Sequence, residues 1–409
     1  MTHRGGRIGV LEPFANRNFT FYFSGQVISH TGTWFQNLAL SLVVLDATGS
    51  ARALSGVTVA QFLPLLLLSI PAGWVADRVR PRSILMVTSM ASAVVVGMLA
   101  VVTFEPAPAT GKIYLLVAAL GTAHTFERVA AQALIYEIVG PSGLTRAVSV
   151  ATIALASARS IGPGLAGLVF QNLGASACMI INASSFVLVF FSILIIRAER
   201  LFPRATGVRA DSGRLSLRRN RALMTLLVVN VIITLFAFNL MLVLTATVTL
   251  TFEGDAASLG AVHALNALGA IVGGLAAAGR TDTPVRALAF ACVLLGAALL
   301  VNAAAPTLLI FLVLGPFLGL GVGYFQGILH AAAQASVPPE QIGRTMSLVT
   351  LGNYGMMPFG ALLIAGVIDA YDGRVALAVG GAAALLCAVF VVARLGWPRR
   401  KEPDARQTL

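Results

Sequence analysis

The chain is organised around a short charged segment that joins two long apolar runs, Gly73-Trp74-Val75-Ala76-Asp77-Arg78-Val79-Arg80-Pro81-Arg82-Ser83. A connection this short makes the two flanking helices antiparallel neighbours. Asp77 is the only acid beside three arginines, which indicates a specific contact for its carboxylate. The segment therefore predicts a helical hairpin with a charged end.

The composition excludes a soluble protein. Hydrophobic residues make up 57% of the 409 residues, charged residues make up only 11%, and the mean hydropathy is +0.88. Soluble domains carry about 25% charged residues, so lipid must be the solvent for much of this surface. Runs of about 20 apolar residues recur along the chain, and each is long enough to cross a bilayer.

We expect an all-α membrane protein with twelve spans, separated by charged residues, Gly or Pro. The first apolar run shows no cleavage site and is expected to remain as a helix. Cys178, Cys292 and Cys387 lie in apolar runs and are expected to be buried rather than disulfide-bonded. The spans cover approximately residues 19–44, 53–76, 83–104, 113–138, 144–172, 175–196, 222–250, 258–279, 286–304, 306–333, 345–368 and 375–396.

The basic residues are distributed unevenly between the two sides of these spans. Of the 28 Lys and Arg residues, 23 lie on one side, whereas only Arg52, Lys112 and Arg374 lie on the other. By the positive-inside rule, both termini face the cytoplasm, in a bacterial-type cytoplasmic (inner) membrane. This asymmetry and contact with anionic lipid explain the net charge of +12 without a nucleic-acid partner.

A basic linker at residues 197–221 divides the spans into six plus six. A shift of the sequence by 198 residues places Arg146 over Arg344 and Pro141 over Pro339, which indicates an internal repeat. Parallel six-helix repeats are a transporter architecture with a binding site near the bilayer midplane. The expected parts are an N-terminal bundle (1–196), the linker, a C-terminal bundle (222–396) and a cytoplasmic tail (397–409).

The opening segment resembles the signature of the major facilitator superfamily, Gly-x-Leu-Ala-Asp-Arg-x-Gly-Arg-Lys. Arg80 and Pro81 depart from this signature, so glycine does not set the turn. Other motifs resemble the branch that exports drugs, macrolides and siderophores such as enterobactin. The matching residues are Gly73, Ala76, Asp77, Arg78 and Arg82 for the signature, and Arg17-Asn18-Phe19, Phe23-Ser24-Gly25-Gln26, Leu63-Pro64, Pro71-Ala72-Gly73 and Gly343-Arg344-Thr345-Met346-Ser347 for the branch.

Charged residues inside the spans are the candidates for substrate binding or proton coupling, because charge within a bilayer is costly. Glu127 lies roughly 16 Å from the inner end of its span, at 1.5 Å per residue. Arg159, on the next span, is near the same depth, so Glu127 is expected to pair with Arg159 or with its neighbour Arg128. Two interpretations remain open: a structural ion-pair cluster, or a transport site in which the surplus arginines attract an anionic substrate.

The resemblance to the exporter branch also implies which charged residues to expect in the span that contains Glu127. The branch has an acid at the place of Glu127 and another at the place of Glu137, but it usually has an arginine at the place of Ala131. Arg128, one turn earlier, is expected to replace that arginine. His30 and His124 also lie within spans, and either proton transfer or a structural hydrogen bond explains a buried histidine there. No metal site is expected, since His124 and Glu127 have no third ligand at a suitable spacing.

Two further groups of residues are expected to serve transport. Amides of the spans, with Tyr354 and several phenylalanines, either line an apolar cavity or pair with each other in the core. The conformational group includes Asp77, whose carboxylate is expected to meet the N-terminal end of the span after Arg344 and so to favour an outward-open state. The amides are Gln36, Asn239, Asn266, Gln326 and Asn353, and the conformational group comprises Gly73, Asp77, Arg78, Arg82, Arg146, Arg344, Gly162, Pro163 and Gly164.

The sequence thus predicts a monomeric secondary transporter that exports a small amphipathic molecule in exchange for protons by alternating access. Import or facilitated passage of a small metabolite is the alternative, and a membrane sensor or scaffold that does not transport is a third. No phosphate-binding loop of the Walker form and no nucleophile motif is present in the sequence, so neither ATP-driven transport nor an enzyme is expected. No cofactor is expected.

Overall fold

In this computed structural model, the described elements are all helical. The structure describes residues 12–105, 108–197, 199, 201–203, 220–279, 284–338 and 341–396. Most of the predicted linker (204–219) and the predicted tail (397–409) lie outside the described residues. The elements are η1 (Glu12–Ala15), α1 (Arg17–Thr48), α2 (Ala51–Arg78), α3 (Pro81–Val102), α4 (Thr110–Leu194), α5 (Arg221–Phe236), α6 (Leu240–Ala246), η3 (Thr247–Thr251), α7 (Ala256–Ala278), α8 (Pro284–Ala303), α9 (Leu308–Ala335), α10 (Ile342–Thr350), η5 (Leu351–Gly355), α11 (Met356–Ala370) and α12 (Gly373–Leu395).

Several helices begin at a polar side chain that accepts a hydrogen bond from their first turn. Ser50 caps α2, Asp255 caps α7 and Asp372 caps α12 in this way. Such caps satisfy backbone N–H groups that have no partner inside the helix. Helix α1 ends at Gly49, whose φ of 61° is the left-handed conformation that glycine adopts easily.

The charged opening segment closes its hairpin without glycine. Val79 and Arg80 both have extended backbone, with φ/ψ of −103°/145° and −62°/129°. A residue before proline favours this extended region, and proline is itself well suited to the first position of a helix. Pro81 therefore ends the link and starts α3, which explains how the chain departs from the family signature at this turn.

The helix boundaries differ from the predicted spans at four places. Helix α4 contains three predicted spans, which are separated only at Gly140 (φ 69°) and Gly174 (φ 79°) rather than by loops. The predicted span 222–250 is interrupted between α5 and α6 and ends in the π-helix η3. The predicted span 345–368 contains a second π-helix, η5. Single-turn π segments widen a helix and are frequent at functional sites.

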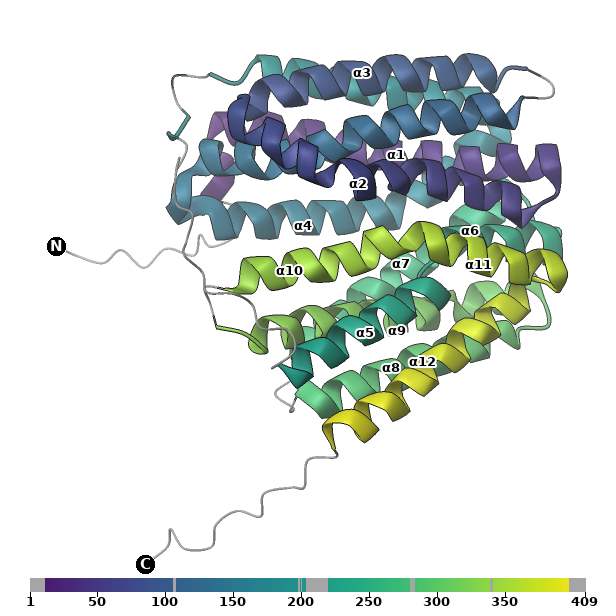
Figure 1. The fold of residues 1–409 in the computed structure, drawn as a ribbon. Helices are drawn as coiled ribbons and strands as arrows, with labels where there is room; N and C mark the ends of the chain where they lie inside the picture. The colour runs from purple at the N-terminus through teal and green to yellow at the C-terminus, as the bar shows by residue number, and fades with distance from the viewer. Residues whose placement is uncertain are drawn as a thin grey trace, which may run out of the picture.

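Helices α1 to α4 lie together in one part of the molecule and α5 to α12 in another, with their long axes running in similar directions (Figure 1). Helix α1 begins and α12 ends at the same end of the molecule. We call this end the basic face, because Arg78, Arg82 and Arg344 lie at helix ends there and Arg146 lies close to the break in α4 at Gly140. The other end, which holds Arg52, Lys112 and Arg374, is the opposite face.

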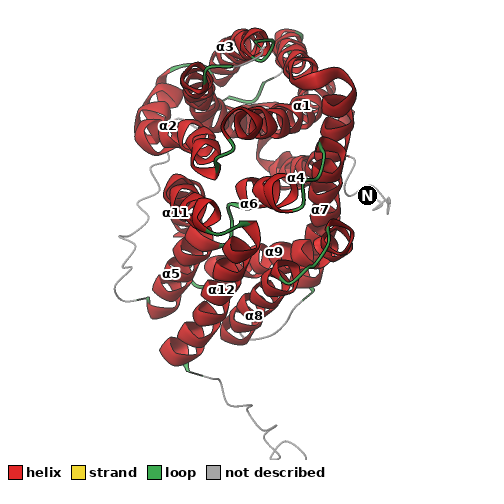
Figure 2. Ribbon diagram, turned by 90° about the vertical axis from the view of Figure 1, so that its right-hand side faces the viewer, coloured by secondary structure: helices red, strands yellow, loops and turns green. Residues whose placement is uncertain are grey.

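The two sets of helices make most of their mutual contacts through α2 and α4. Helix α2 packs against α11 and η5, and α4 packs against α7 (Figure 2). Large apolar side chains point outward elsewhere; Ile70 on α2 is 84% exposed and Leu115 on α4 is 73% exposed. Within the described part of the chain, nine helices are long and apolar enough to cross a membrane. The protein is therefore an integral membrane protein whose exposed apolar surface faces lipid.

Candidate functional site

The charged residues predicted inside the spans lie beside the boundary between the two sets of helices. His124 Nε2 is 4.0 Å from Glu127 Oε2 on the same helix, α4. The charge of Arg128 acts on His124 and on His30 of α1, so α1 and α4 contribute to one cluster. Among the described residues, no arginine nitrogen lies within 4.0 Å of Glu127. The expected ion pair of Glu127 with Arg159 or Arg128 is therefore not formed in this structure.

Arg128 contacts the other set of helices. Its guanidinium carbon is 4.5 Å from the centre of the Tyr354 ring, which is a cation–π distance. The Tyr354 ring also stacks on Phe62 of α2, with the ring centres 5.9 Å apart. Tyr354 belongs to the π-helix η5, so this one side chain joins α2 and α4 to the C-terminal helices. Phe62 was not predicted to take part in this contact. The two glycines that flank Asn353-Tyr354 are a sequence sign of the irregular helix that holds Tyr354.

Arg159 lies farther along α4, on the same boundary. Its charge interacts with Tyr354 and with His263 of α7. No carboxylate oxygen of the described residues lies within 4.0 Å of its guanidinium nitrogens. Among the described residues, two arginines therefore approach this boundary, and the nearby acid Glu127 is paired with neither of them.

The predicted amides lie mostly in the helix core. Gln36 is only 2% exposed and accepts a 2.8 Å hydrogen bond from Asn182. Asn239 is 3% exposed and donates to the Thr234 carbonyl, while Asn353 accepts a hydrogen bond from the Thr234 hydroxyl. These contacts favour the interpretation as core amides for these residues. Gln326 on α9 is half-buried, and Asn266 on α7 is buried.

The Gly162-Pro163-Gly164 segment of α4 lies where three helices meet. A Cβ atom on Gly162 would be 2.8 Å from Trp34 Cβ of α1, and one on Gly164 would be 3.5 Å from Ala264 Cβ of α7. The next glycine, Gly167, contacts Gly260 and the Ala256 carbonyl of α7. Small residues thus permit the closest approach between α4 and α7, as they do in many membrane helix pairs.

The remaining predicted conformational residues lie on the basic face. The Arg82 Nη2 donates a 2.9 Å hydrogen bond to the Leu194 carbonyl, and the Arg78 guanidinium lies 3.8 Å from the centre of the Trp74 ring. Arg146 forms an ion pair with Glu12. Gly73 has open space around its Cα, and the side chains of Asp77 and Arg344 are exposed.

On the opposite face, hydrogen bonds that were not predicted from the sequence join the two sets of helices. Asp369, at the end of α11, accepts hydrogen bonds from Ser50 Oγ (3.0 Å), Ala51 N (2.6 Å) and Arg52 N (3.1 Å) at the start of α2. A second contact joins α4 to α7, where Gln171 Nε2 donates to Asp255 Oδ2 at 3.0 Å. Hydrogen bonds from Ser258 and Gln171 hold the pKa of Asp255 below its usual range, so this acceptor stays ionised at neutral pH.

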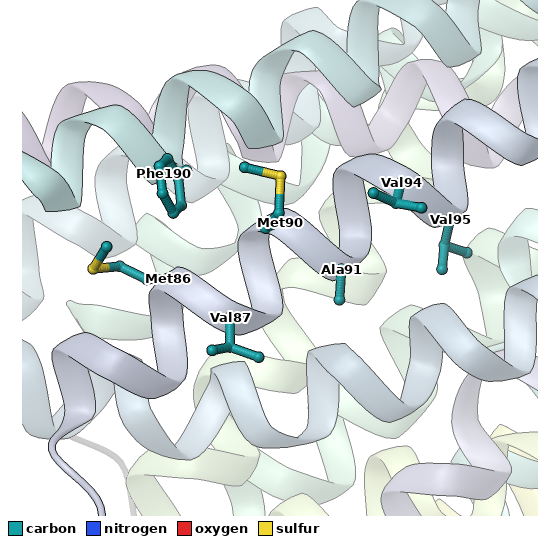
Figure 3. A pocket seen from close by; sticks show the side chains of 7 residues that line it. All are labelled: Met86, Val87, Met90, Ala91, Val94, Val95 and Phe190. Carbon is teal, nitrogen blue, oxygen red and sulfur yellow. The ribbon is translucent and has the colours of Figure 1, made fainter.

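An apolar groove lies away from the charged cluster, between α3 and the last part of α4 (Figure 3). Its lining has no charged side chain, and Val87 and Val94 are largely exposed. Such a surface contacts lipid chains in a bilayer. The groove is therefore not the candidate site. The candidate site is the charged boundary between the two sets of helices. The groove residues are Met86, Val87, Met90, Ala91, Val94, Val95 and Phe190.

The sequence of this chain is similar to those of known membrane transporters. The model of the transmembrane secretion effector family, within the major facilitator superfamily, matches residues 8–408. Macrolide efflux protein A of Streptococcus pyogenes is 24% identical over 372 residues, which is 87% of this chain and 91% of that protein. The multidrug efflux pump Tap of Mycolicibacterium fortuitum is 25% identical over 347 residues, 81% of this chain and 85% of that protein.

The fold is also similar to solved structures. A bacterial homologue of the human lysosomal transporter Spinster, in an inward-facing and occupied conformation, superposes with a TM-score of 0.67. The two share 13% sequence identity over 94% of this chain and 96% of that chain. At this low sequence identity, the structural similarity shows a shared fold and nothing more.

Proposed function

Because the chain belongs to the transmembrane secretion effector family of the major facilitator superfamily, we propose that it exports a small amphipathic molecule in exchange for protons. Twelve spans arranged as two six-helix bundles would then rock around a site at their boundary. Efflux is the activity named for the macrolide and multidrug relatives. In this proposal both termini are cytoplasmic, so the basic face is the cytoplasmic face of a bacterial-type inner membrane.

The observation that carries this proposal is the position of Glu127. It is the acid next to Arg128, whose guanidinium stacks on Tyr354 across the boundary between the two bundles. A proton on Glu127 would free Arg128 from a neighbouring negative charge, and this would alter the contact with Tyr354. The protonation of Glu127 would thereby be coupled to the contact between Arg128 and Tyr354, which must change when the bundles rock.

The first test is a resistance and flux screen in a bacterial strain that lacks its own exporters. Expression of the chain is expected to raise the inhibitory concentration of at least one amphipathic drug class. Collapse of the proton gradient is expected to raise the cellular content of the same drug. Accumulation of the compound on expression would instead favour the importer. No change for any compound, with the protein present in the membrane, would favour the sensor or scaffold.

In the proposed cycle, the present structure corresponds to closure at the opposite face, where Asp369 and Gln171 join the bundles. Asp77 is exposed on the basic face. In the other state it would meet the positive N-terminal end of α10, beside Arg344. A carboxylate at a helix N-terminus contributes about 0.3–1 kcal/mol.

Replacement of Asp77 by Asn is therefore expected to shift the population toward the inward-open state by about two- to five-fold. A maleimide that cannot cross membranes should label Ser347→Cys on α10 faster in inside-out vesicles of the mutant. The three native cysteines are buried and give a low background. Equal labelling rates with and without the Asp77 change would leave Asp77 with only a topological role.

A further inference from the structure

The boundary between α4 and α7 holds a set of polar groups that the exporter mechanism above does not use. Arg159 comes from α4, whereas His263 and Asn266 come from α7. The close contacts of Gly164 with Ala264 and of Pro163 with Gly260 fix the register of the two helices. Because this part of α4 runs antiparallel to α7, the next turn toward the basic face brings Arg159 to the depth of the segment from His263 to Asn266. The electrostatic interaction of Arg159 with His263 agrees with this placement.

Two of these residues, His263 and Asn266, are buried without the partners that such groups normally have. His263 is 8% exposed and Asn266 is 4% exposed. Within the part of the chain that the structure describes, neither His263 Nε2 nor Asn266 Nδ2 has a hydrogen-bond partner. Arg159, as shown above, has no carboxylate within ion-pair distance. Leaving buried polar groups unpaired costs about 1–3 kcal/mol each, and more for a charge.

The three groups have complementary chemistry. A guanidinium has only donors, the amide nitrogen of asparagine is a donor, and a neutral imidazole donates through Nε2 in one tautomer. A carboxylate or a similar oxyanion accepts from all three, and an arginine fork binds it with two hydrogen bonds. The ring of Tyr354, which contacts Arg128 and Phe62, supplies an aromatic surface on the same boundary.

We propose that Arg159, His263 and Asn266 form a subsite for the anionic group of the substrate, which makes the substrate an amphipathic organic anion. This inference rests on the proposed transport function and narrows its substrate class. The subsite spans both bundles, so the bound anion holds the two sides of the boundary together. Its release requires the two helices to separate, as they do when the bundles rock.

A matched pair of probes tests the subsite. Dansylglycine carries a carboxylate beside an aromatic ring, whereas its methyl ester is neutral and has nearly the same shape. Binding to the full chain in phosphatidylcholine nanodiscs is measured by energy transfer from tryptophan to the dansyl group. Trp34 is a suitable donor, because it packs against Gly162 on α4. We expect dansylglycine to bind at least about tenfold more tightly than its ester, as one arginine–carboxylate pair in a partly buried site would give.

Variants show whether the preference comes from this subsite. Arg159→Gln should remove the preference for dansylglycine over the ester, and Arg159→Lys should restore part of it. Arg17→Gln, which removes an exposed arginine at the start of α1, is the matched control and should leave the preference unchanged. Equal binding of acid and ester to the wild-type chain, no binding in the millimolar range, or an unchanged preference in Arg159→Gln would each overturn the inference.

A lipid phosphate offers the same chemistry as a substrate carboxylate. Nanodiscs that contain phosphatidylglycerol distinguish the two sources. Unchanged dansylglycine affinity in these nanodiscs supports the substrate assignment, and displacement of the probe by this lipid would overturn it in favour of a headgroup site. The outcome is separable from the proposed function, because a chain that exports neutral drugs but fails these tests would still be an exporter.

Discussion

Replacement of Glu127 by Gln is expected to abolish proton-driven transport while the protein still folds and reaches the membrane. Glutamine has nearly the same shape as glutamate but cannot change charge. Glu127 has no arginine within 4.0 Å among the described residues, so the substitution breaks no close ion pair with arginine. We expect the initial rate of efflux driven by a pH gradient to fall at least about tenfold, equivalent to about 1.4 kcal/mol in the barrier.

Two assays in proteoliposomes separate proton coupling from a structural role. Efflux driven by a pH gradient requires the proton to bind and leave, whereas exchange of labelled for unlabelled substrate at equal pH does not. Glu127→Gln should lose the first activity and keep the second. Glu105→Gln, a neutralised acid outside the site that pairs with Lys112, should keep both. Normal gradient-driven efflux in Glu127→Gln would contradict the coupling role, and loss of both activities would assign Glu127 to structure.

The sequence was sufficient to place most helices. Helix ends follow from local features, such as the Ser50, Asp255 and Asp372 caps, and these features act within a few residues of the chain. The depth of Glu127 in α4 follows from the helical rise alone. The breaks at Gly140 and Gly174 fall between predicted spans, but the sequence did not show that each break would be one glycine with a positive φ instead of a loop.

Contacts between the bundles could not be predicted in the same way. Tyr354 is placed between Phe62 and Arg128 by packing of three helices that are far apart in the sequence. Arg128 prefers this ring to Glu127, so the ion pair expected from helical spacing is absent among the described contacts. Gln36 points to Asn182 inside its own bundle, a choice that depends on helix rotation. Helical periodicity gives the depth of a side chain but not its partner.

The contact of Asp369 with α2 is another that the sequence pattern does not predict. Its carboxylate accepts three hydrogen bonds from the start of α2, two of them from backbone N–H groups, and Arg52 Nε lies 3.8 Å away. The start of a helix carries partial positive charge, so the contact is electrostatic as well. The Asp369 side chain is only 19% exposed. Hydrogen bonds to charged groups contribute about 1.5–3 kcal/mol when well formed.

Replacement of Asp369 by Ala is therefore expected to destabilise the state that is closed at the opposite face by about 2 kcal/mol. That energy corresponds to a change of roughly 30-fold in the ratio of the two states. Spin labels at Glu105→Cys and Leu309→Cys, one on each set of helices near the opposite face, report the change. The fraction of molecules with the longer distance between labels should rise in Asp369→Ala measured in nanodiscs.

Asp372 provides the matched control for this experiment. It lies three residues from Asp369 and also caps a helix. The capped helix is α12, which belongs to the same set of helices as Asp372, and Val375 N donates to Asp372 Oδ1 at 2.7 Å. Asp372→Ala should lower thermal stability by about 1 kcal/mol, as loss of an N-cap does, without lengthening the distance between the labels. If both variants left the label distances unchanged, the Asp369 contact would be a helix cap without influence on alternating access. If Asp369→Ala alone opened the opposite face, rocking of the bundles would be controlled by a single carboxylate at the end of α11.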